Sequence, residues 1–149
     1  MRRSPVMMDT ELKRAILIDH YQKPHNHGLV EDARYRMKHQ ASSSCIDDIK
    51  VQLDIEGDIV KDVRFDGVGC TISTASTSIF SDLIKGKKRA EALEMIEQYY
   101  RLLKGEAGDY EDLEEAQAFE TLYAQPNRVK CGLIGVEAME ELIRESYEK

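Results

Sequence analysis

The sequence has few cysteines, no long hydrophobic run and no excess of basic residues, and each shortage excludes a class of protein. The longest apolar stretches, such as Ala15 to Ile18 and Leu133 to Val136, are far shorter than the roughly 20 residues that span a bilayer. With 28 acidic and 21 basic residues the formal charge is −7, so a nucleic acid would meet a repulsive surface. We therefore expect neither a membrane nor a nucleic acid as a partner.

The cysteine content does not suit a disulfide framework. Three cysteines are an odd number, and Met1 to Pro5 are followed by no sustained apolar run of the kind found in secretory signals. We expect a cytoplasmic protein with reduced thiols. A chain of 149 residues is long enough for one apolar core, so we expect a single domain over residues 1–149, with residues 1–8 as a candidate disordered segment.

Alternating apolar residues predict three strands. Apolar and polar residues alternate from Ile49 to Ile55 and again from Ile59 to Phe65, with a glycine-containing turn between them. This pattern is typical of a hairpin that is apolar on one side. A weaker alternation over residues 33–40 predicts another strand. These segments together predict a small three-stranded antiparallel sheet.

Apolar residues at helical spacing predict several helices that pack against this sheet, which gives an α+β fold. Residues 105–127 are acidic, and the apolar spacing within them predicts short helical pieces on the surface. The four longer helices are expected over residues 9–23, 71–85, 89–104 and 132–146.

Four side chains have the chemistry to fill a tetrahedral metal shell: Cys45, Asp47, Cys70 and Cys131. Cys45 and Asp47 are two residues apart, so in an extended segment both point to the same side and one ion can touch both. Zinc accepts thiolate sulfur and carboxylate oxygen and is commonly four-coordinate. Cys70 and Cys131 each precede a predicted helix, whose N-terminus would stabilise a thiolate. The four residues are therefore a candidate zinc site.

The same residues have a simpler interpretation. Cys70 and Cys131 can be small buried hydrophobic residues, and Asp47 can be an ordinary loop carboxylate. The long separations between the cysteines match no compact zinc-finger pattern. Spacing alone leaves both interpretations open.

The four histidines are weaker candidates for metal binding. We expect His20 to form hydrogen bonds at the end of a helix, and His25 and His27 to be exposed in a turn. His39, close to Cys45 in the sequence, is the one candidate for a substitute ligand.

Three segments carry a resemblance to a known family. They are LKRAILIDHYQKPHNHG from Leu12 to Gly28, DGVGCTISTASTS from Asp66 to Ser78, and PNRVKCGL from Pro126 to Leu133. They resemble, in order and over nearly the whole chain, the opening signature and the second and third cysteine segments of the iron–sulfur cluster assembly scaffold family, which includes the bacterial IscU and SufU proteins. Lys130, where IscU proteins have a histidine, and the acidic segment 105–125 resemble the SufU branch.

The resemblance implies the same α+β fold and a zinc site formed by Cys45, Asp47, Cys70 and Cys131. It further implies that Cys45 accepts persulfide sulfur from a SufS-type cysteine desulfurase and that downstream iron–sulfur assembly proteins receive it. Two alternatives remain. The same thiolates can hold a [2Fe–2S] cluster during its assembly, or the metal can be purely structural.

The chain departs from the family around the first cysteine, where relatives usually have Asn-Pro-Thr-Cys-Gly-Asp-Arg and this chain has SSSCIDD from Ser42 to Asp48. Glycine between two ligands permits backbone angles that a β-branched residue such as Ile46 resists. Asp48, in place of a basic residue, adds negative charge beside an anionic site. We therefore expect a divergent member in which these two residues weaken metal binding or alter the choice of partner.

Overall fold

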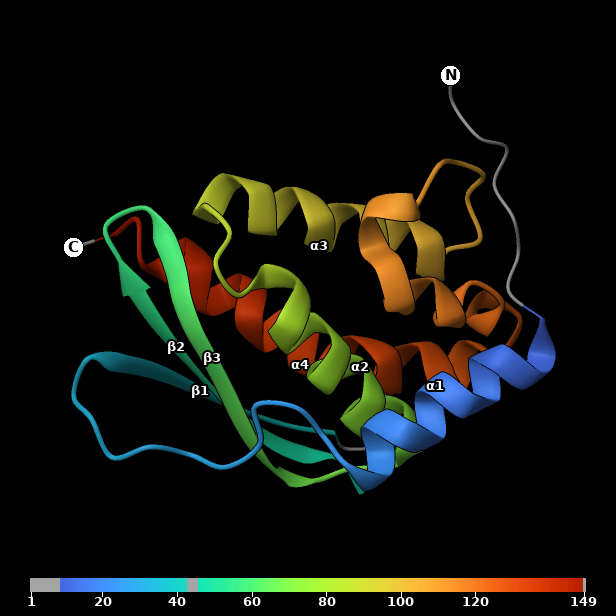
Figure 1. Cartoon of the computed structure of the whole chain (residues 1–149), viewed down its shortest axis with the longest axis horizontal. Coiled ribbons are helices and arrows are strands. Elements are labelled where there is room, and N and C mark those ends of the chain that lie inside the picture. The colour runs from blue at the N-terminus through green and yellow to red at the C-terminus, as the bar shows by residue number, and fades with distance from the viewer. Residues whose placement is uncertain (1–8, 43–45, 149) are drawn as a thin grey trace.

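The computed structural model describes residues 9–42 and 46–148. Residues 1–8, the candidate disordered segment, lie outside this part. The described chain has one three-stranded antiparallel sheet, with strand order β1-β2-β3, and several helices (Figure 1), which confirms the predicted fold class. The elements are α1 Thr10–Gln22, β1 Tyr35–Ala41, β2 Asp48–Glu56, β3 Ile59–Val68, α2 Thr71–Ile84, α3 Arg89–Leu103, the 3₁₀ helices η1 Glu111–Phe119 and η2 Leu122–Ala124, and α4 Pro126–Glu145.

The central strand β2 carries the apolar face of the sheet. Its residues Ile49, Val51 and Leu53 are at most 2% exposed, as the alternation predicts. In β3 the prediction for Ile59 is wrong, because Ile59 is exposed and Val60 is buried in its place. The pairing of β2 with β3 shifts register next to Ile55, and such an irregularity exchanges the two faces of the strand beyond it.

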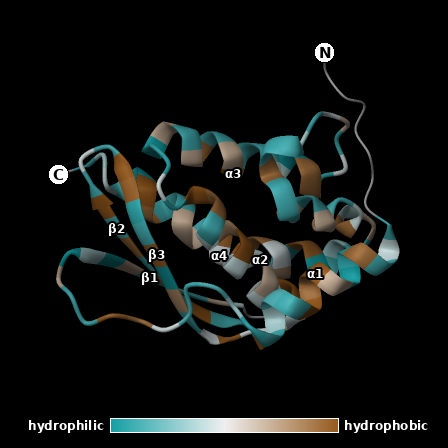
Figure 2. Ribbon diagram, viewed as in Figure 1, coloured by the Kyte–Doolittle hydropathy of each residue, from teal (hydrophilic) through white to brown (hydrophobic). Residues whose placement is uncertain are grey.

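Helices α2 and α4 pack across one face of the sheet, and α3 lies beyond them (Figure 1). Hydrophobic segments gather on β2, β3, α2 and α4, while the outer side of α3 is hydrophilic (Figure 2). The ring centroid of Tyr99 in α3 lies 4.6 Å from that of Phe80 in α2 and 6.0 Å from that of Phe119 in η1. None of the helices in the described part of the chain has the length and apolar character that a membrane span requires.

The acidic segment between α3 and α4 forms short helices, as predicted, but its apolar residues are not on the surface. Leu113, Ala116, Phe119 and Leu122 are at most 7% exposed and belong to the hydrophobic core. Burial of apolar area is the main driving force for such packing, so this segment is held against the rest of the fold.

Helix α4 begins at Pro126, six residues before the predicted start. Pro126 occupies the first helical position, where its fixed φ and its missing N–H are both compatible with a helix. Cys131 therefore lies in the second turn of α4 instead of before its N-terminus. The expectation that a helix N-terminus stabilises the Cys131 thiolate is wrong for this reason.

Candidate metal centre

Three of the four predicted metal ligands come together where β2 begins. One ligand atom from each of Asp47, Cys70 and Cys131 lies within 4.8 Å of the other two. Asp47 is 1% exposed, Cys131 is 5% exposed and Cys70 is partly buried. Within residues 9–42 and 46–148 this is the only such group of three Asp, Glu, His or Cys side chains.

The fourth predicted ligand, Cys45, lies outside the described residues, so its place in the site stays a prediction. It belongs to the connection between β1 and β2. The ends of this connection are joined by a hydrogen bond in which the Ser42 N–H donates to the Asp47 carbonyl oxygen at 2.8 Å. Ile46, which replaces the usual glycine, is 66% exposed.

The Asp47 carboxylate is fixed by donors at the start of α2. The Cys70 N–H donates to Oδ1 at 2.9 Å, and the Ser73 hydroxyl donates to the same oxygen at 2.8 Å. A buried carboxylate needs such donors because burial removes its hydration. The partial positive charge of the helix N-terminus acts in the same direction, so α2 stabilises Asp47 as well as Cys70.

Cys70 is the N-cap residue of α2, as the sequence predicts, with φ −73° and ψ 176°. Its Sγ atom accepts a hydrogen bond from the Ser73 N–H at 3.5 Å. Two glycines allow the chain to reach this position. A Cβ on Gly67, whose φ is +132°, would lie 2.1 Å from the Asp48 carbonyl oxygen, and a Cβ on Gly69 would lie 2.5 Å from Ser73 Oγ. Gly67 and Gly69 thus let the chain before Cys70 pack closely against β2 and the start of α2.

Close packing of α4 places Cys131. A Cβ on Gly135, one turn after Cys131, would lie 2.0 Å from Thr77 Oγ1, so α4 touches α2 directly at this point. Gly132 similarly leaves room for Leu122, and its carbonyl oxygen accepts a hydrogen bond from the Tyr99 hydroxyl at 2.8 Å. Gly135 therefore brings α4 against α2, and with it the Cys131 thiol toward Cys70, while Gly132 allows α4 to approach η2 and α3.

The ligand set and its spacing fit zinc. A Zn–S bond of about 2.3 Å in tetrahedral geometry separates two sulfur ligands by about 3.8 Å. The ligand atoms of Asp47, Cys70 and Cys131 already lie within 4.8 Å of one another, so shifts of about an ångström would bring these three to the separation that zinc requires, with one position of the shell left for a fourth ligand. Thiolate with carboxylate suits a borderline cation such as Zn²⁺ better than a hard cation such as Mg²⁺ or Ca²⁺.

The exposed histidines pair with carboxylates. His39, the candidate for a substitute ligand, has its Nε2 atom 2.5 Å from Asp48 Oδ1 and is not part of the ligand group. The charge that Asp48 adds to the family pattern therefore has a partner outside the metal centre. His27 lies 3.0 Å from Asp66 Oδ1 and is exposed, as predicted.

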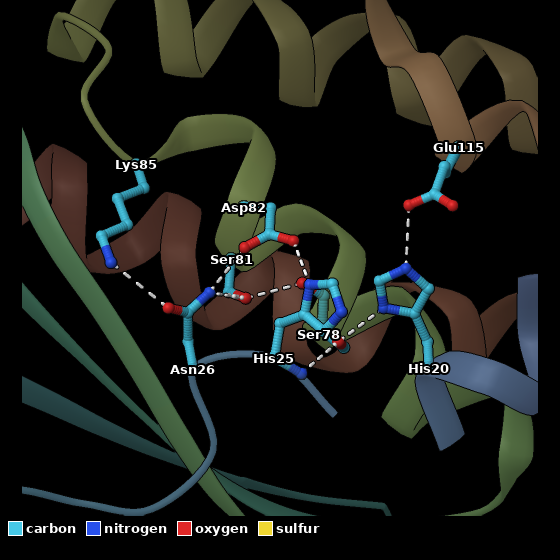
Figure 3. A network of polar contacts seen from close by, with 8 residues as sticks. All are labelled: His20, His25, Asn26, Ser78, Ser81, Asp82, Lys85 and Glu115. Atoms are coloured by element: carbon cyan, nitrogen blue, oxygen red, sulfur yellow. Dashed lines mark hydrogen bonds and ion pairs between the residues drawn. The ribbon is translucent and has the colours of Figure 1, made fainter. Parts of the chain in front are cut away.

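His20 is buried and forms hydrogen bonds at the end of α1, as predicted, but sequence reasoning missed its partners. Its Nδ1 atom lies 2.7 Å from Ser78 Oγ and its Nε2 atom 2.9 Å from Glu115 Oε1 (Figure 3). The ring of the exposed His25 pairs with Asp82, and the backbone N–H of His25 donates to Ser78 Oγ at 2.8 Å. This network joins α1, α2 and the acidic segment. The sequence contains no pattern that predicts contact between His20, at the end of α1, and Glu115, in the acidic segment.

Comparisons with known proteins agree with this architecture. The family model described as "NifU-like N terminal domain" matches residues 12–132. The chain is 35% identical to the zinc-dependent sulfurtransferase SufU of Bacillus subtilis over 90% of each chain. It is 31% identical to the iron–sulfur cluster assembly scaffold protein IscU of Streptococcus pyogenes over 91% of this chain and 84% of the relative. The crystal structure of a putative SUF-system scaffold protein from Fervidobacterium islandicum superposes with a TM-score of 0.75 and 28% identity, covering 89% of this chain and 98% of the other.

Proposed function

The chain belongs to the NifU-like N-terminal domain family of iron–sulfur cluster assembly scaffolds, and we propose that it is a zinc-dependent sulfur-transfer protein of the SufU branch. The observation that carries the proposal is the group formed by Asp47, Cys70 and Cys131, with Cys45 two residues before the carboxylate. The similarity to a relative that is named a zinc-dependent sulfurtransferase supports it. We assign the activity to the cytoplasm, where thiols stay reduced.

Cys45, Asp47, Cys70 and Cys131 are the proposed zinc ligands. When bound, zinc keeps cysteine ligands deprotonated at neutral pH and has no redox chemistry of its own. Asp47 and Cys131 are buried and held by α2 and by the contact between α2 and α4. We assign the holding of the ion to these two residues and Cys70, and the reaction with sulfur to Cys45.

In the proposed transfer, the Cys45 thiolate attacks the outer sulfur of a persulfide on a SufS-type cysteine desulfurase. A new S–S bond forms at Cys45, the S–S bond of the donor persulfide breaks, and the leaving thiolate stays on the desulfurase. The exchange needs no external oxidant or reductant. Downstream iron–sulfur assembly proteins would then receive the sulfur from Cys45.

Two exposed apolar side chains support a docking partner at this face. Ile46 is 66% exposed and immediately precedes Asp47, and Val68 is 60% exposed and lies two residues before Cys70. Large apolar side chains that flank a site without being buried are suited to contact with another protein. The replacement of glycine by Ile46 therefore adds an exposed apolar side chain beside the site.

A second candidate function is the assembly of a [2Fe–2S] cluster on the same thiolates, which the scaffold name of the Streptococcus pyogenes relative favours. Lys130, an exposed residue of α4, stands before Cys131 where IscU proteins have a histidine and offers no comparable ligand at neutral pH. A third possibility is a metal that only stabilises the fold. Metal analysis with an acid-labile sulfide assay on the isolated protein distinguishes these: zinc without sulfide agrees with sulfur transfer or a structural metal, and iron with sulfide indicates a cluster.

The deciding experiment mixes the zinc-loaded protein with a SufS-type desulfurase and cysteine and examines the protein by mass spectrometry under non-reducing conditions. We expect one additional sulfur atom on Cys45 and faster cysteine turnover by the desulfurase. Cys45→Ala should abolish both effects while the protein stays folded. Stimulation that persists in Cys45→Ala would refute the role of this residue as the acceptor.

A further inference from the structure

We propose that Ser73 is a positioning residue of the metal centre, which orients the Asp47 carboxylate as a ligand. This inference rests on the metal centre of the proposed function but not on sulfur transfer. Ser73 is fully buried and lies one turn after Cys70 in α2. It contacts two of the predicted ligands with two different groups, since its N–H faces Cys70 Sγ at 3.5 Å and its hydroxyl faces Asp47 Oδ1 at 2.8 Å.

The single proton of the Ser73 hydroxyl is directed to Asp47. The two alternative partners of the hydroxyl lie farther away: the Cys70 carbonyl oxygen at 3.2 Å, which already accepts a hydrogen bond from the Thr74 N–H at 3.0 Å, and Cys70 Sγ at 3.6 Å. A carboxylate is also the stronger acceptor, because hydrogen bonds to ionised groups are shorter and about twice as strong as those between neutral groups. The Ser73–Asp47 hydrogen bond is therefore the preferred one.

Both donors that the start of α2 supplies go to the same oxygen of Asp47. The Cys70 N–H and the Ser73 hydroxyl each donate to Oδ1, so together they restrain the rotation of the Asp47 carboxylate. The Ser73 hydroxyl therefore helps to set how this carboxylate faces the two thiols. Hydrogen-bonded partners of this kind orient metal ligands in many proteins, and their loss typically lowers metal affinity by about 10- to 100-fold.

The backbone around Ser73 is shaped to admit this hydroxyl. A Cβ on Gly69 would lie 2.5 Å from Ser73 Oγ and 3.0 Å from Thr74 Oγ1, so a side chain at position 69 would displace the hydroxyl from its place. Alanine at position 73 removes the hydroxyl and keeps the N–H that faces Cys70 Sγ. The substitution therefore tests the bond to Asp47 and leaves the backbone cap of α2 in place.

The test measures zinc affinity by competition with a chromophoric chelator, and the Co²⁺ absorption spectrum, for the full chain and for Ser73→Ala. We expect affinity to fall by about 10- to 100-fold and the ligand-field bands of bound Co²⁺ to change, because Asp47 is less well oriented. Ser81→Ala is the matched control. Its hydroxyl is also buried on α2, and it donates to the Ser78 carbonyl oxygen at 2.6 Å, away from the metal centre.

A double-mutant cycle with Asp47→Ala separates positioning from general damage. If Ser73 acts through Asp47, then adding Ser73→Ala to Asp47→Ala should lower zinc affinity no further. An equal loss in both backgrounds, or wild-type affinity and spectrum in Ser73→Ala, would overturn the proposal. Thermal unfolding of the metal-free variants shows that each is folded. These measurements do not involve sulfur transfer. If the variants show the expected zinc affinities but no persulfide forms on Cys45, only the proposed function is contradicted.

Discussion

Thr77 of α2 and Gly135 of α4 are in direct contact, with no room for a side chain at position 135: a Cβ there would lie 2.0 Å from Thr77 Oγ1 and 2.9 Å from Thr77 Cβ. Because Cys131 lies one turn before Gly135, this contact governs how near α4 brings the thiol to Cys70. The distance between two helix backbones thus enters the geometry of the metal centre.

Gly135→Ala should destabilise the protein and weaken zinc binding. Alanine favours a helix interior over glycine by about 1 kcal/mol, but overpacking typically costs about 1–3 kcal/mol, and a 2.0 Å approach requires movement of α4. Urea unfolding of the metal-free protein and chelator competition measure the two effects. Thr77→Ala in the same chain should recover part of both losses, since it removes the closest of the clashing atoms. A Gly135→Ala protein with unchanged zinc affinity would show that the contact does not set the site.

Cys70 has two separable roles, as a predicted ligand and as the N-cap of α2. Serine is a good N-cap residue and alanine a poor one, and loss of a cap costs about 0.5–2 kcal/mol. We expect Cys70→Ser and Cys70→Ala to lose zinc affinity alike. In urea unfolding of the metal-free proteins, Cys70→Ala should be the less stable of the two by about 1 kcal/mol. Equal stabilities would contradict a capping role for this side chain.

The buried Ser78 links α2 to α1 and to the segment that follows α1, because its Oγ atom accepts a hydrogen bond from the backbone N–H of His25 and lies 2.7 Å from His20 Nδ1 (Figure 3). Ser78→Ala leaves these two groups without that partner in a largely buried place, which should lower the free energy of unfolding by about 1–3 kcal/mol. Thr71→Ala, an exposed change on the same helix, should stay within about 0.5 kcal/mol of the wild type. Similar stabilities of the two variants, measured by urea unfolding, would argue against the network.

The hydrogen bond of Tyr35 predicts that the free energy of unfolding depends on pH in the alkaline range. The Tyr35 hydroxyl donates to Asp62 Oδ2 at 2.6 Å, and this bond, with burial and nearby carboxylates, raises the pKa of Tyr35 to about 12. A group whose pKa is raised on folding stabilises the protein below its unfolded pKa, near 10, and that contribution is lost as the pH rises from 10 through 12. The stability advantage of the wild type over Tyr35→Phe should therefore be smaller at pH 11 than at pH 8. A constant difference in unfolding free energy would rule out the raised pKa.

Local periodicity was sufficient to predict most of the fold. Ile49, Val51 and Leu53 follow the alternation of a one-sided strand, and they are buried as expected. The error at Ile59 arose because a register shift depends on the pairing of two strands, which no single-strand pattern contains. The early start of α4 at Pro126 was missed because a proline can either end one segment or begin a helix, and its position alone does not decide which.

The candidate site was predictable in its chemistry but not in its supports. Thiols and a carboxylate are ligands that zinc accepts, so Asp47, Cys70 and Cys131 were candidates from the sequence. Their spacing alone left buried, metal-free cysteines equally open, and the family resemblance favoured the metal site. Ser73 could not be named from the sequence, because serine is common in helices and only the folded structure places its hydroxyl 2.8 Å from Asp47. The contribution of Gly135 is equally invisible in a sequence, since its role depends on where Thr77 lies.

The three gathered ligands are separated along the chain by intervening elements: β2 and β3 lie between Asp47 and Cys70, and α2, α3 and the acidic segment lie before Cys131. An ion held by all three would act as a cross-link that encloses more than half of the sequence, between positions 47 and 131. An unfolded chain cannot assemble such a shell, so occupancy would raise the free energy of unfolding as metal concentration exceeds the dissociation constant. Zinc availability would then control the lifetime of the protein as well as its reactivity.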